Sequence, residues 1–245
     1  MRIGVISDVH ANLPALDAAL SALRSLEVDR ILCCGDIIGC GPWPAETLDT
    51  LRREAVRSVR GNHDDAVLHL ARYRRPGAED DLRMLSWTDA QLDGSQRAYL
   101  AGLPRRHCEG HLTLAHGSLR SPLEQIEYVL DIEAAQGSFD RLDTWIGLLG
   151  HAHIQSGFVQ DRHGISRLDA SETTIPLDLE SRYLINPGSV GLPRDGDTRA
   201  AYAWLDLDAG SLGFGRAAYD AAPVARAMRD LGFDTLCRFP LPEAV

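Results

Sequence analysis

The stretch VISDVHAN, residues 5–12, joins the end of a buried strand pattern to two side chains that can bind a metal. Residues 2–6, with the apolar run from Ile3 to Ile6, predict a buried strand, and Asp8 and His10 follow shortly after it. Alternate side chains of an extended chain point the same way, so these two would lie on one side of the strand end. The stretch therefore predicts part of a metal site, for which other segments must supply further ligands.

The same change from apolar strand to polar cluster occurs four more times along the chain. Strands predicted at 30–34, 55–59, 112–115 and 145–149 run into GD, GNHD, HGS and GHAH. Ligands of open sheets bind beyond the carboxyl ends of the strands, so these clusters can converge. A turn-capping residue would explain any single cluster, but five such strand ends favour a metal site. The residues concerned are Asp8, His10, Asp36, Asn62, His63, His116, His151 and His153.

The chemistry of these donors narrows the choice of metal. The set contains imidazoles, carboxylates and one amide oxygen, but no thiolate. Such donors suit Mn, Fe, Zn, Co or Ni better than a structural zinc site rich in Cys. There are more donors than one tetrahedral ion needs, which predicts two ions that share a bridging carboxylate and leave positions for water and substrate.

Composition and charge exclude several classes of protein. The 245 residues fit one large domain or two small ones, and 44% of them are hydrophobic, enough for a substantial core. A net charge of −10 without a basic stripe disfavours a nucleic-acid binder or nuclease. An anionic substrate remains compatible, because bound cations would make the site locally positive.

Cysteine usage and hydropathy predict a cytoplasmic protein. The number of Cys is odd and no C-x-x-C occurs, which favours reduced thiols over a disulfide framework. The N-terminal apolar run is too short for a signal peptide, and no run is long enough to span a membrane. The cysteines are Cys33, Cys34, Cys40, Cys108 and Cys237.

The order of predicted elements favours a mixed α and β fold. Residues 1–65 repeat a strand–loop–helix unit, with helices at 14–26 and 44–53, as parallel sheets with crossover helices do. Residues 66–104 are Arg-rich and helical in pattern, and are predicted as a helical insertion, which could act as a lid, in a single domain of residues 1–245. Later segments predict helices at 125–136 and 220–231, a loop at 170–182, a strand at 183–185, and hairpins at 156–168 and 201–217.

Taken in order, the motifs D-x-H, G-D, G-N-H-[DE], H-G and G-H-x-H resemble those of the calcineurin-like metallophosphoesterases. The stretches GDIIGCGPWP (35–44) and NPGSVGLPRDGD (186–197) further resemble a bacterial branch of small phosphatases and phosphodiesterases. That branch is related to diadenosine tetraphosphatases and Ser/Thr protein phosphatases. The resemblance implies an α+β fold, a four-layer α/β/β/α sandwich with mixed sheets.

The resemblance also implies which residues bind which ion. Two divalent cations, most simply Mn²⁺, would lie side by side, and a metal-bound hydroxide would attack the phosphorus of a bridging phosphoryl group. One carboxylate would bridge the ions. The first ion would be bound by Asp8, His10, Asp36 and His153, and the second by Asp36, Asn62, His116 and His151.

His63 is assigned as the general acid that protonates the leaving group, or as a donor that stabilises charge in the transition state. Protein phosphatases of this superfamily place an Asp three residues after the bridging carboxylate to orient this His, and an Arg beside it to bind phosphate. This chain has Gly39 and Cys40 at those positions, which disfavours that activity. Asp64 or Asp65 is an alternative partner for His63.

The function predicted from these residues is hydrolysis of a phosphomonoester or phosphodiester of a small substrate such as a nucleotide. A Ser/Thr protein phosphatase, a dinucleoside polyphosphate hydrolase and a non-catalytic metal-bound scaffold are the alternatives, and a homo-oligomer is open. Arg194 is predicted to contact the substrate phosphate. Trp43, Tyr73 and Trp87 could stack a base, although such aromatics more often pack in a core or subunit interface.

Overall fold

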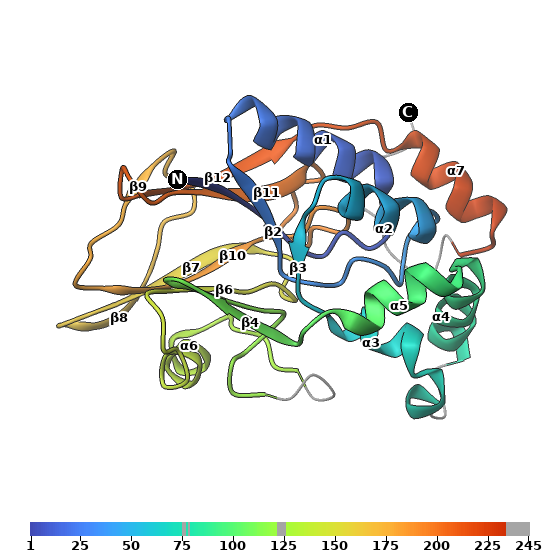
Figure 1. Cartoon of the computed structure of the whole chain (residues 1–245), viewed down its shortest axis with the longest axis horizontal. Helices are drawn as coiled ribbons and strands as arrows, with labels where there is room; N and C mark the ends of the chain where they lie inside the picture. The colour runs from blue at the N-terminus through green and yellow to red at the C-terminus, as the bar shows by residue number, and fades with distance from the viewer. Residues whose placement is uncertain (75–76, 78, 122–125, 234–245) are drawn as a thin grey trace.

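Two six-stranded mixed sheets lie face to face in the computed structural model, which describes residues 1–74, 77, 79–121 and 126–233 (Figure 1). The first sheet has the order β3-β2-β1-β11-β12-β9, in which β1 runs parallel to β2 and antiparallel to β11. Its strands are β1 (Arg2–Ile6), β2 (Arg30–Cys33), β3 (Arg57–Ser58), β9 (Ile175–Pro176), β11 (Ala200–Asp206) and β12 (Ser211–Ala217).

The second sheet has the order β4-β5-β6-β10-β7-β8, with β5, β6 and β10 parallel to one another. Apolar side chains of both sheets form one shared core, in which Ile3 and Val5 of β1 belong to the same cluster as Leu114 and Leu148. Its strands are β4 (Arg106–Glu109), β5 (Leu112–Ala115), β6 (Ile146–Leu148), β7 (Gln155–Asp161), β8 (Gly164–Arg167) and β10 (Arg182–Pro187).

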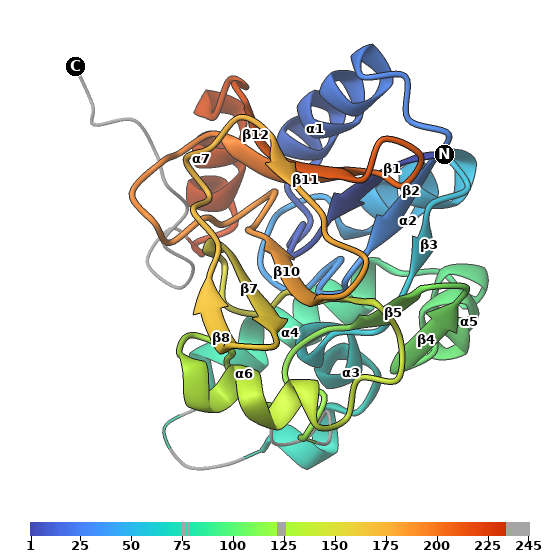
Figure 2. The ribbon, with the colours of Figure 1, turned by 90° about the vertical axis from the view of Figure 1, so that its left-hand side faces the viewer.

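Helices cover the outer faces of both sheets, as two views at right angles show (Figures 1 and 2). The helices α1 (Leu13–Ser25) and α2 (Pro44–Arg53) bury Leu16, Leu20 and Leu48 against the first sheet. The helix α6 (Ile132–Phe139) buries Phe139 against the second sheet. The order helix, sheet, sheet, helix confirms the predicted α+β sandwich.

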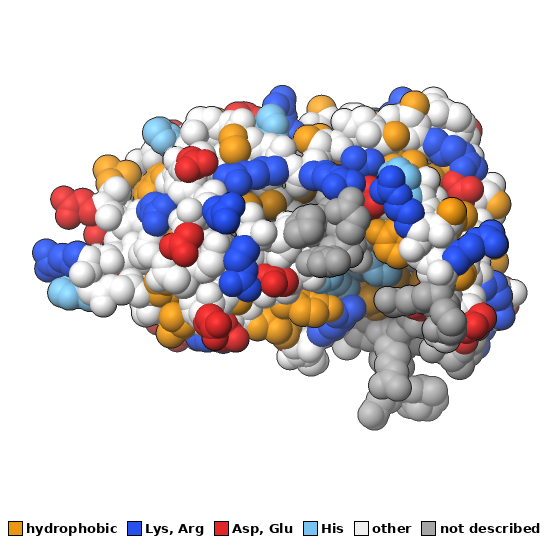
Figure 3. Space-filling model, turned by 90° about the horizontal axis from the view of Figure 1, so that it is seen from below, with side chains coloured by type: hydrophobic (Ala, Val, Ile, Leu, Met, Phe, Trp, Pro, Cys, Tyr) orange, Lys and Arg blue, Asp and Glu red, His pale blue; other side chains and the backbone are white. Residues whose placement is uncertain are grey.

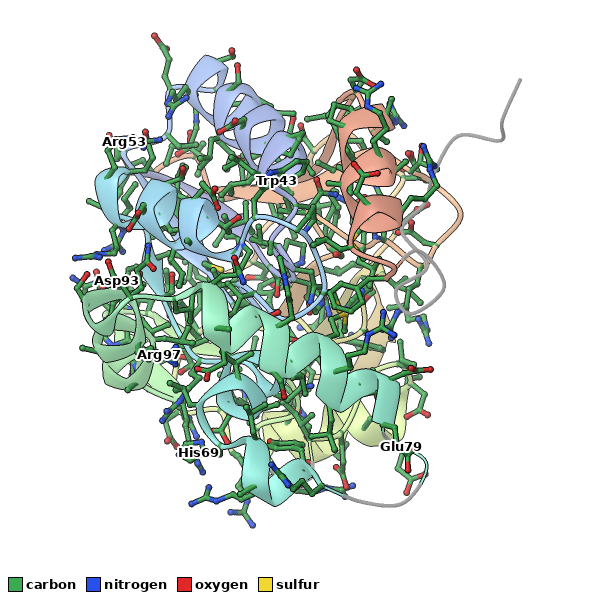
Figure 4. The ribbon with its side chains drawn as sticks, turned by 90° about the vertical axis from the view of Figure 1, so that its right-hand side faces the viewer. Trp43, Arg53, His69, Glu79, Asp93 and Arg97 are labelled. Atoms are coloured by element: carbon green, nitrogen blue, oxygen red, sulfur yellow. The ribbon has the colours of Figure 1, made fainter. Side chains whose placement is uncertain are left out.

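The segment predicted as a helical insertion contains helices, and it adds side chains to the main core. Its elements are α3 (Asn62–Leu68), a 3₁₀ turn η1 (Leu70–Tyr73), α4 (Glu79–Gln91) and α5 (Gly94–Gly102). Figure 4 shows α4 and α5 beside α2, with Asp93 at the start of α5, where its carboxylate caps the helix. Leu85 and Leu100 pack in the same cluster as α1 and α2. The division into domains and the lid role stay predictions.

Some element boundaries differ from those predicted. Position 125 lies outside the described residues, and 126–131 are not helical, because α6 begins only after Asp131, whose carboxylate caps the helix by accepting from Ala134 N at 2.9 Å. Residues 170–182, predicted as loop, contain the two-residue edge strand β9. The closing helix is α7 (Ala222–Asp230). The strand β4 was not predicted, and α3 begins at Asn62, before the predicted start of the helical insertion at residue 66.

The cysteines and helices bear on two further expectations. Cys33 and Cys34 are buried free thiols, Cys40 is buried and Cys108 is exposed, while Cys237 lies outside the described residues. Among the described helices, none has the length and apolar character needed to cross a membrane.

Candidate metal centre

The polar clusters that follow β1, β2, β5 and β6 meet at one end of the two sheets, together with the start of α3. The backbone joins these loops directly, since Asp8 N donates to Gly35 O at 2.9 Å and Gly150 N donates to His116 O at 2.7 Å. In the space-filling view, His side chains lie in a hollowed region of one face with Arg side chains around it (Figure 3). The predicted convergence of these strand ends therefore occurs.

Besides a group formed by His10, Cys40 and His63, two groups of ligand atoms occur at this end of the sheets, and the atoms within each group lie within 4.8 Å of one another. Asp36 belongs to both groups, which together contain six of the seven predicted ligands. The seventh, Asn62, places its Oδ1 3.1 Å from Nε2 of His116. The first group consists of Asp8, His10, Asp36 and His153, and the second of Asp36, His116 and His151.

Five of these residues have backbone angles that only Gly adopts readily. Their φ values are 53° for Asp8, 49° for His10, 51° for Asp36, 67° for His151 and 59° for His153. A left-handed conformation costs a residue with a Cβ about 1–2 kcal/mol. Such strain persists where the surrounding structure enforces it, and it concentrates at functional sites. The sharp turns at the strand ends therefore direct these side chains toward one another.

Two imidazoles are oriented by main-chain carbonyl groups. His116 Nδ1 lies 2.8 Å from Cys34 O, and His153 Nδ1 lies 2.6 Å from Leu192 O. A carbonyl oxygen can only accept, so the proton of each neutral ring is on Nδ1 and the lone pair is on Nε2. That Nε2 faces a carboxylate, 3.1 Å from Asp36 Oδ2 for His116 and 3.2 Å from Asp8 Oδ1 for His153. This pattern is typical of metal-binding His residues.

Two buried carboxylates face the imidazoles of the centre, and one of these pairs changes the pKa of both partners. Asp8 and Asp36 are buried, and Asp36 Oδ2 accepts no well-aligned hydrogen bond from the described residues. Burial acts against ionisation of Asp36, but His116 holds the pKa of that carboxyl well below its ordinary value. Burial likewise lowers the pKa of His116, but Asp36 outweighs this effect and raises it to about 9. The residues thus fit divalent cations, which would neutralise both carboxylates.

Asp64 connects the loop after β2 to the start of α3. Its carboxylate accepts from the backbone N–H groups of Ile37 at 2.9 Å, Ile38 at 3.1 Å and Gly61 at 2.9 Å. A Cβ on Gly61 would overlap Asp36 Oδ1, so this close approach requires Gly. Burial raises the pKa of Asp64 to about 7. These three hydrogen bonds hold Asp64 against the backbone, and its role as the partner of His63 stays a prediction.

Asp65, the other candidate partner of His63, is oriented elsewhere. Its buried carboxylate lies 3.4 Å from Nδ1 of His69, 3.6 Å from Arg105 and 3.7 Å from Arg60. These contacts turn the Asp65 carboxylate toward His69 and the two Arg side chains.

His63 lies against the first group of ligands. Its backbone N–H donates to Asp36 Oδ1 at 2.8 Å, and its ring meets that of His10 edge-on with centroids 4.9 Å apart. Its Nδ1 lies 4.0 Å from Cys40 Sγ. A Cβ added to Gly39 would lie 2.7 Å from His63 Cβ, so the imidazole occupies the space that a side chain at position 39 would need.

The NPGS stretch (186–189), which begins in the last two residues of β10, forms hydrogen bonds to the loops that carry the candidate ligands. Ser189 Oγ donates to Asp8 O at 2.7 Å and accepts from Leu192 N at 2.7 Å, and Asn186 Nδ2 donates to Gly150 O at 2.7 Å. Arg194 N donates to His153 O at 3.0 Å, while the Arg194 side chain is exposed. Its contact with a substrate phosphate stays a prediction.

Tyr128 is a neighbour of the centre that no sequence pattern indicated. Its ring stacks on that of His151, with centroids 4.2 Å apart and planes at 10°. The segment around Tyr128 was predicted to be helical, and a helix there would have given the Tyr128 side chain different neighbours. An exposed aromatic in an irregular segment gives no local signal of the residue it covers.

Comparisons with known proteins agree with this geometry. Residues 1–210 match the model of the calcineurin-like phosphoesterase superfamily domain. An uncharacterized protein of Methanocaldococcus jannaschii is 36% identical over 211 residues, which are 83% of this chain and 82% of that protein. A metallophosphoesterase of Sphaerobacter thermophilus superposes with a TM-score of 0.81 at 37% identity, covering 99% of this chain and 95% of the other. A hypothetical protein of Pyrococcus horikoshii shares the fold at 19% identity, with a TM-score of 0.77 and coverage of 99% and 94%.

Proposed function

Because this chain belongs to the calcineurin-like phosphoesterase superfamily and is a metal-dependent phosphoesterase, we propose that it hydrolyses a phosphomonoester or phosphodiester of a small molecule at a pair of divalent cations. The observation that carries this proposal is the position of Asp36. Its buried carboxylate belongs to two groups of ligand atoms and has one oxygen without an aligned hydrogen bond.

The ions would be held by the residues predicted from the motifs, with Mn²⁺ as the proposed metal. The donor set also suits Fe, Zn, Co or Ni. One ion would be bound by Asp8, His10, Asp36 and His153, and the other by Asp36, Asn62, His116 and His151.

In the proposed reaction, the ions, the metal-binding His residues and His63 have different roles. When bound, the ions would supply positive charge to the phosphoryl oxygens and lower the pKa of a water molecule. Cys34 O and Leu192 O fix the tautomers of His116 and His153, which keeps their Nε2 atoms available. His63, on the flank of the ligand groups, is proposed to protonate the leaving oxygen as its bond to phosphorus breaks.

The bridging role is tested by the metal content of the Asp36→Asn variant. Asn has one carboxylate oxygen fewer and no charge, so the variant should lose at least one ion and about 10³-fold in kcat/KM. The metal content is measured by mass spectrometry on protein purified with added Mn²⁺. Asp17→Asn, on the exposed side of α1, is the control and should retain both ions. An Asp36→Asn protein with full metal content would contradict the proposal.

The role of His63 is tested by varying the leaving group. A general acid matters most for a poor leaving group, so His63→Ala should lose about 10²–10⁴-fold in kcat on phenyl phosphate and less on p-nitrophenyl phosphate. Equal losses on both would favour stabilisation of charge over proton transfer. Full activity on both would exclude either role. His163→Ala, in the exposed turn between β7 and β8, is the control.

A dinucleoside polyphosphate hydrolase is a second candidate, favoured by a cavity of about 140 Å³ beside the centre. Arg105 and Arg106 contribute to its lining beside the candidate metal ligand His116, and the two guanidinium groups could hold a further phosphate. A panel of p-nitrophenyl phosphate, its bis ester, cyclic nucleotides and diadenosine tetraphosphate with added Mn²⁺ separates the candidates. A protein phosphatase is disfavoured, since Cys40 is buried among apolar side chains where the resemblance would place a phosphate-binding Arg.

We also propose a cytoplasmic location, which the free thiols of Cys33 and Cys34 support. A non-catalytic scaffold is the least supported alternative, because the complete set of candidate ligands is present. Metal-replete protein that cleaves no phosphate ester in the panel would favour the scaffold.

A further inference from the structure

A second cavity, of about 280 Å³, opens next to the candidate centre on the side of the inserted helices. It lies among α3, η1 and α4, which pack against one another (Figures 1 and 4). Its lining includes Asn62, His63, Ala66, Tyr73, Met84 and Leu85. We call it the helical cavity.

The helical cavity adjoins the centre at two of its lining residues. Asn62 Oδ1 lies 3.1 Å from His116 Nε2, and the His63 backbone is hydrogen-bonded to Asp36 Oδ1 at 2.8 Å. A phosphoryl group beside Asp36 would therefore have the helical cavity next to it, on the side of His63. That is the side to which a group protonated by His63 must leave.

The lining of the helical cavity suits an uncharged group. Ala66, Met84 and Leu85 are each at most 5% exposed and form an apolar wall. Among the described lining residues, the ionisable side chains besides His63 are Tyr73 and Asp81. The carboxylate of Asp81 would repel a phosphate. The smaller cavity on the His116 side is instead lined by Arg105 and Arg106. Anionic parts of a substrate are thus favoured on the His116 side and uncharged parts on the His63 side.

We propose that the helical cavity binds the leaving alcohol of the substrate, and that this alcohol is uncharged and apolar or aromatic. The inference rests on the proposed function and deepens it, because it makes the alcohol the part of the substrate that is selected. During hydrolysis the bond between phosphorus and the alcohol oxygen breaks, and the oxygen of a water molecule bonds to phosphorus. A proton passes to the alcohol oxygen, and the alcohol is left in the helical cavity.

The kinetic test fills the cavity and compares two substrates. Leu82→Trp and Ala66→Leu add volume from two different helices, while Ala90→Leu, on the exposed face of α4, is the matched control. The KM for 1-naphthyl phosphate should rise at least about tenfold in both filled variants. The KM for glycerol 3-phosphate and the inhibition by inorganic phosphate should stay within about twofold of wild type. Equal changes for both substrates, or none, would overturn the inference.

A binding test without metal keeps this inference separate from the proposed function. Metal-free wild-type protein should bind 1-naphthol in a calorimetric titration, as should Ala90→Leu, and the filled variants should bind it at least about tenfold more weakly. Thermal melting of each variant verifies that it is folded. An active phosphoesterase that neither binds 1-naphthol nor discriminates between the two substrates would refute the cavity assignment alone. A protein that binds 1-naphthol but cleaves no phosphate ester would refute the proposed function and this inference with it.

Discussion

At the scale of single residues, the candidate centre combines strained backbone with buried hydrogen bonds that hold it in place. Asp8 has a φ of 53°, and its carbonyl oxygen accepts from the hydroxyl of Ser189 at 2.7 Å. The backbone N–H of Gly191 also donates to that oxygen, at 3.0 Å. Hydrogen bonds of this kind offset the cost of a left-handed conformation.

Replacing Ser189 with Ala should weaken both folding and metal binding. The change leaves Asp8 O with one hydrogen bond fewer and Leu192 N without its acceptor, at a cost of about 1–3 kcal/mol. Urea unfolding measures the stability, and a Mn²⁺ titration measures the affinity. Ser25→Ala, on the exposed end of α1, is the control. Unchanged unfolding would show that Ser189 does not support the loop.

The cysteines should differ in their reaction with iodoacetamide at pH 8. Burial raises the pKa of Cys33 to about 12 and that of Cys34 well above its ordinary value, so both remain thiols at this pH. Among the described cysteines, the exposed Cys108 should be alkylated first. Peptide mass mapping with and without urea measures the order. Rapid modification of Cys33 in native protein would contradict the buried position of β2.

At the scale of elements, segments with a strong binary pattern were predicted with accurate boundaries. The strands β1 and β5 and the helix α2 begin and end at the residues expected from their apolar spacing. The strand β4 was missed because it is a partly exposed edge strand, in which Arg106 and Cys108 are solvent-facing and only pairing with β5 makes it a strand. Pairing between strands depends on residues outside the segment, so local pattern could not predict it.

Leu100 of α5 tests whether the inserted helices are part of the main core. It is fully buried in the cluster that also contains Leu16 and Leu48. Leu100→Ala should lower the free energy of unfolding by about 2–5 kcal/mol in one cooperative transition. Leu179→Ala, at a side chain that is 80% exposed, is the control and should have little effect. A small effect of Leu100→Ala would instead favour α5 as part of a mobile lid.

At the scale of the whole molecule, the fold buries two carboxylates, Asp8 and Asp36, at the candidate metal centre. The net charge is −10 and the chain has Arg but no Lys, and the carboxylates of Asp8 and Asp36 face imidazoles rather than Arg. The positive charge that the centre needs for an anionic substrate would therefore come from bound metal, as composition alone suggested.

Removal of metal should lower the stability of the whole protein. A cation that binds only the folded state stabilises it by about 2.7 kcal/mol at a hundredfold excess over its Kd. Thermal melting should therefore shift upward with Mn²⁺ and downward with EDTA. In the Asp36→Asn variant, with fewer ligands, the shift should be smaller. Identical melting of wild-type protein in Mn²⁺ and in EDTA would contradict a metal centre.

The sequence by itself determined the strand ends, the identity and order of the candidate ligands and the family resemblance, because these depend on local apolar spacing and on motifs within a few residues. The tertiary structure decided the contacts between distant segments. Asp64 accepts hydrogen bonds from the backbone of the loop after β2, and the His63 ring lies against Gly39. Tyr128 stacks on His151, and the inserted helices form the helical cavity. Such contacts depend on how two sheets and their helices pack, and packing is a property of the whole chain rather than of any one stretch.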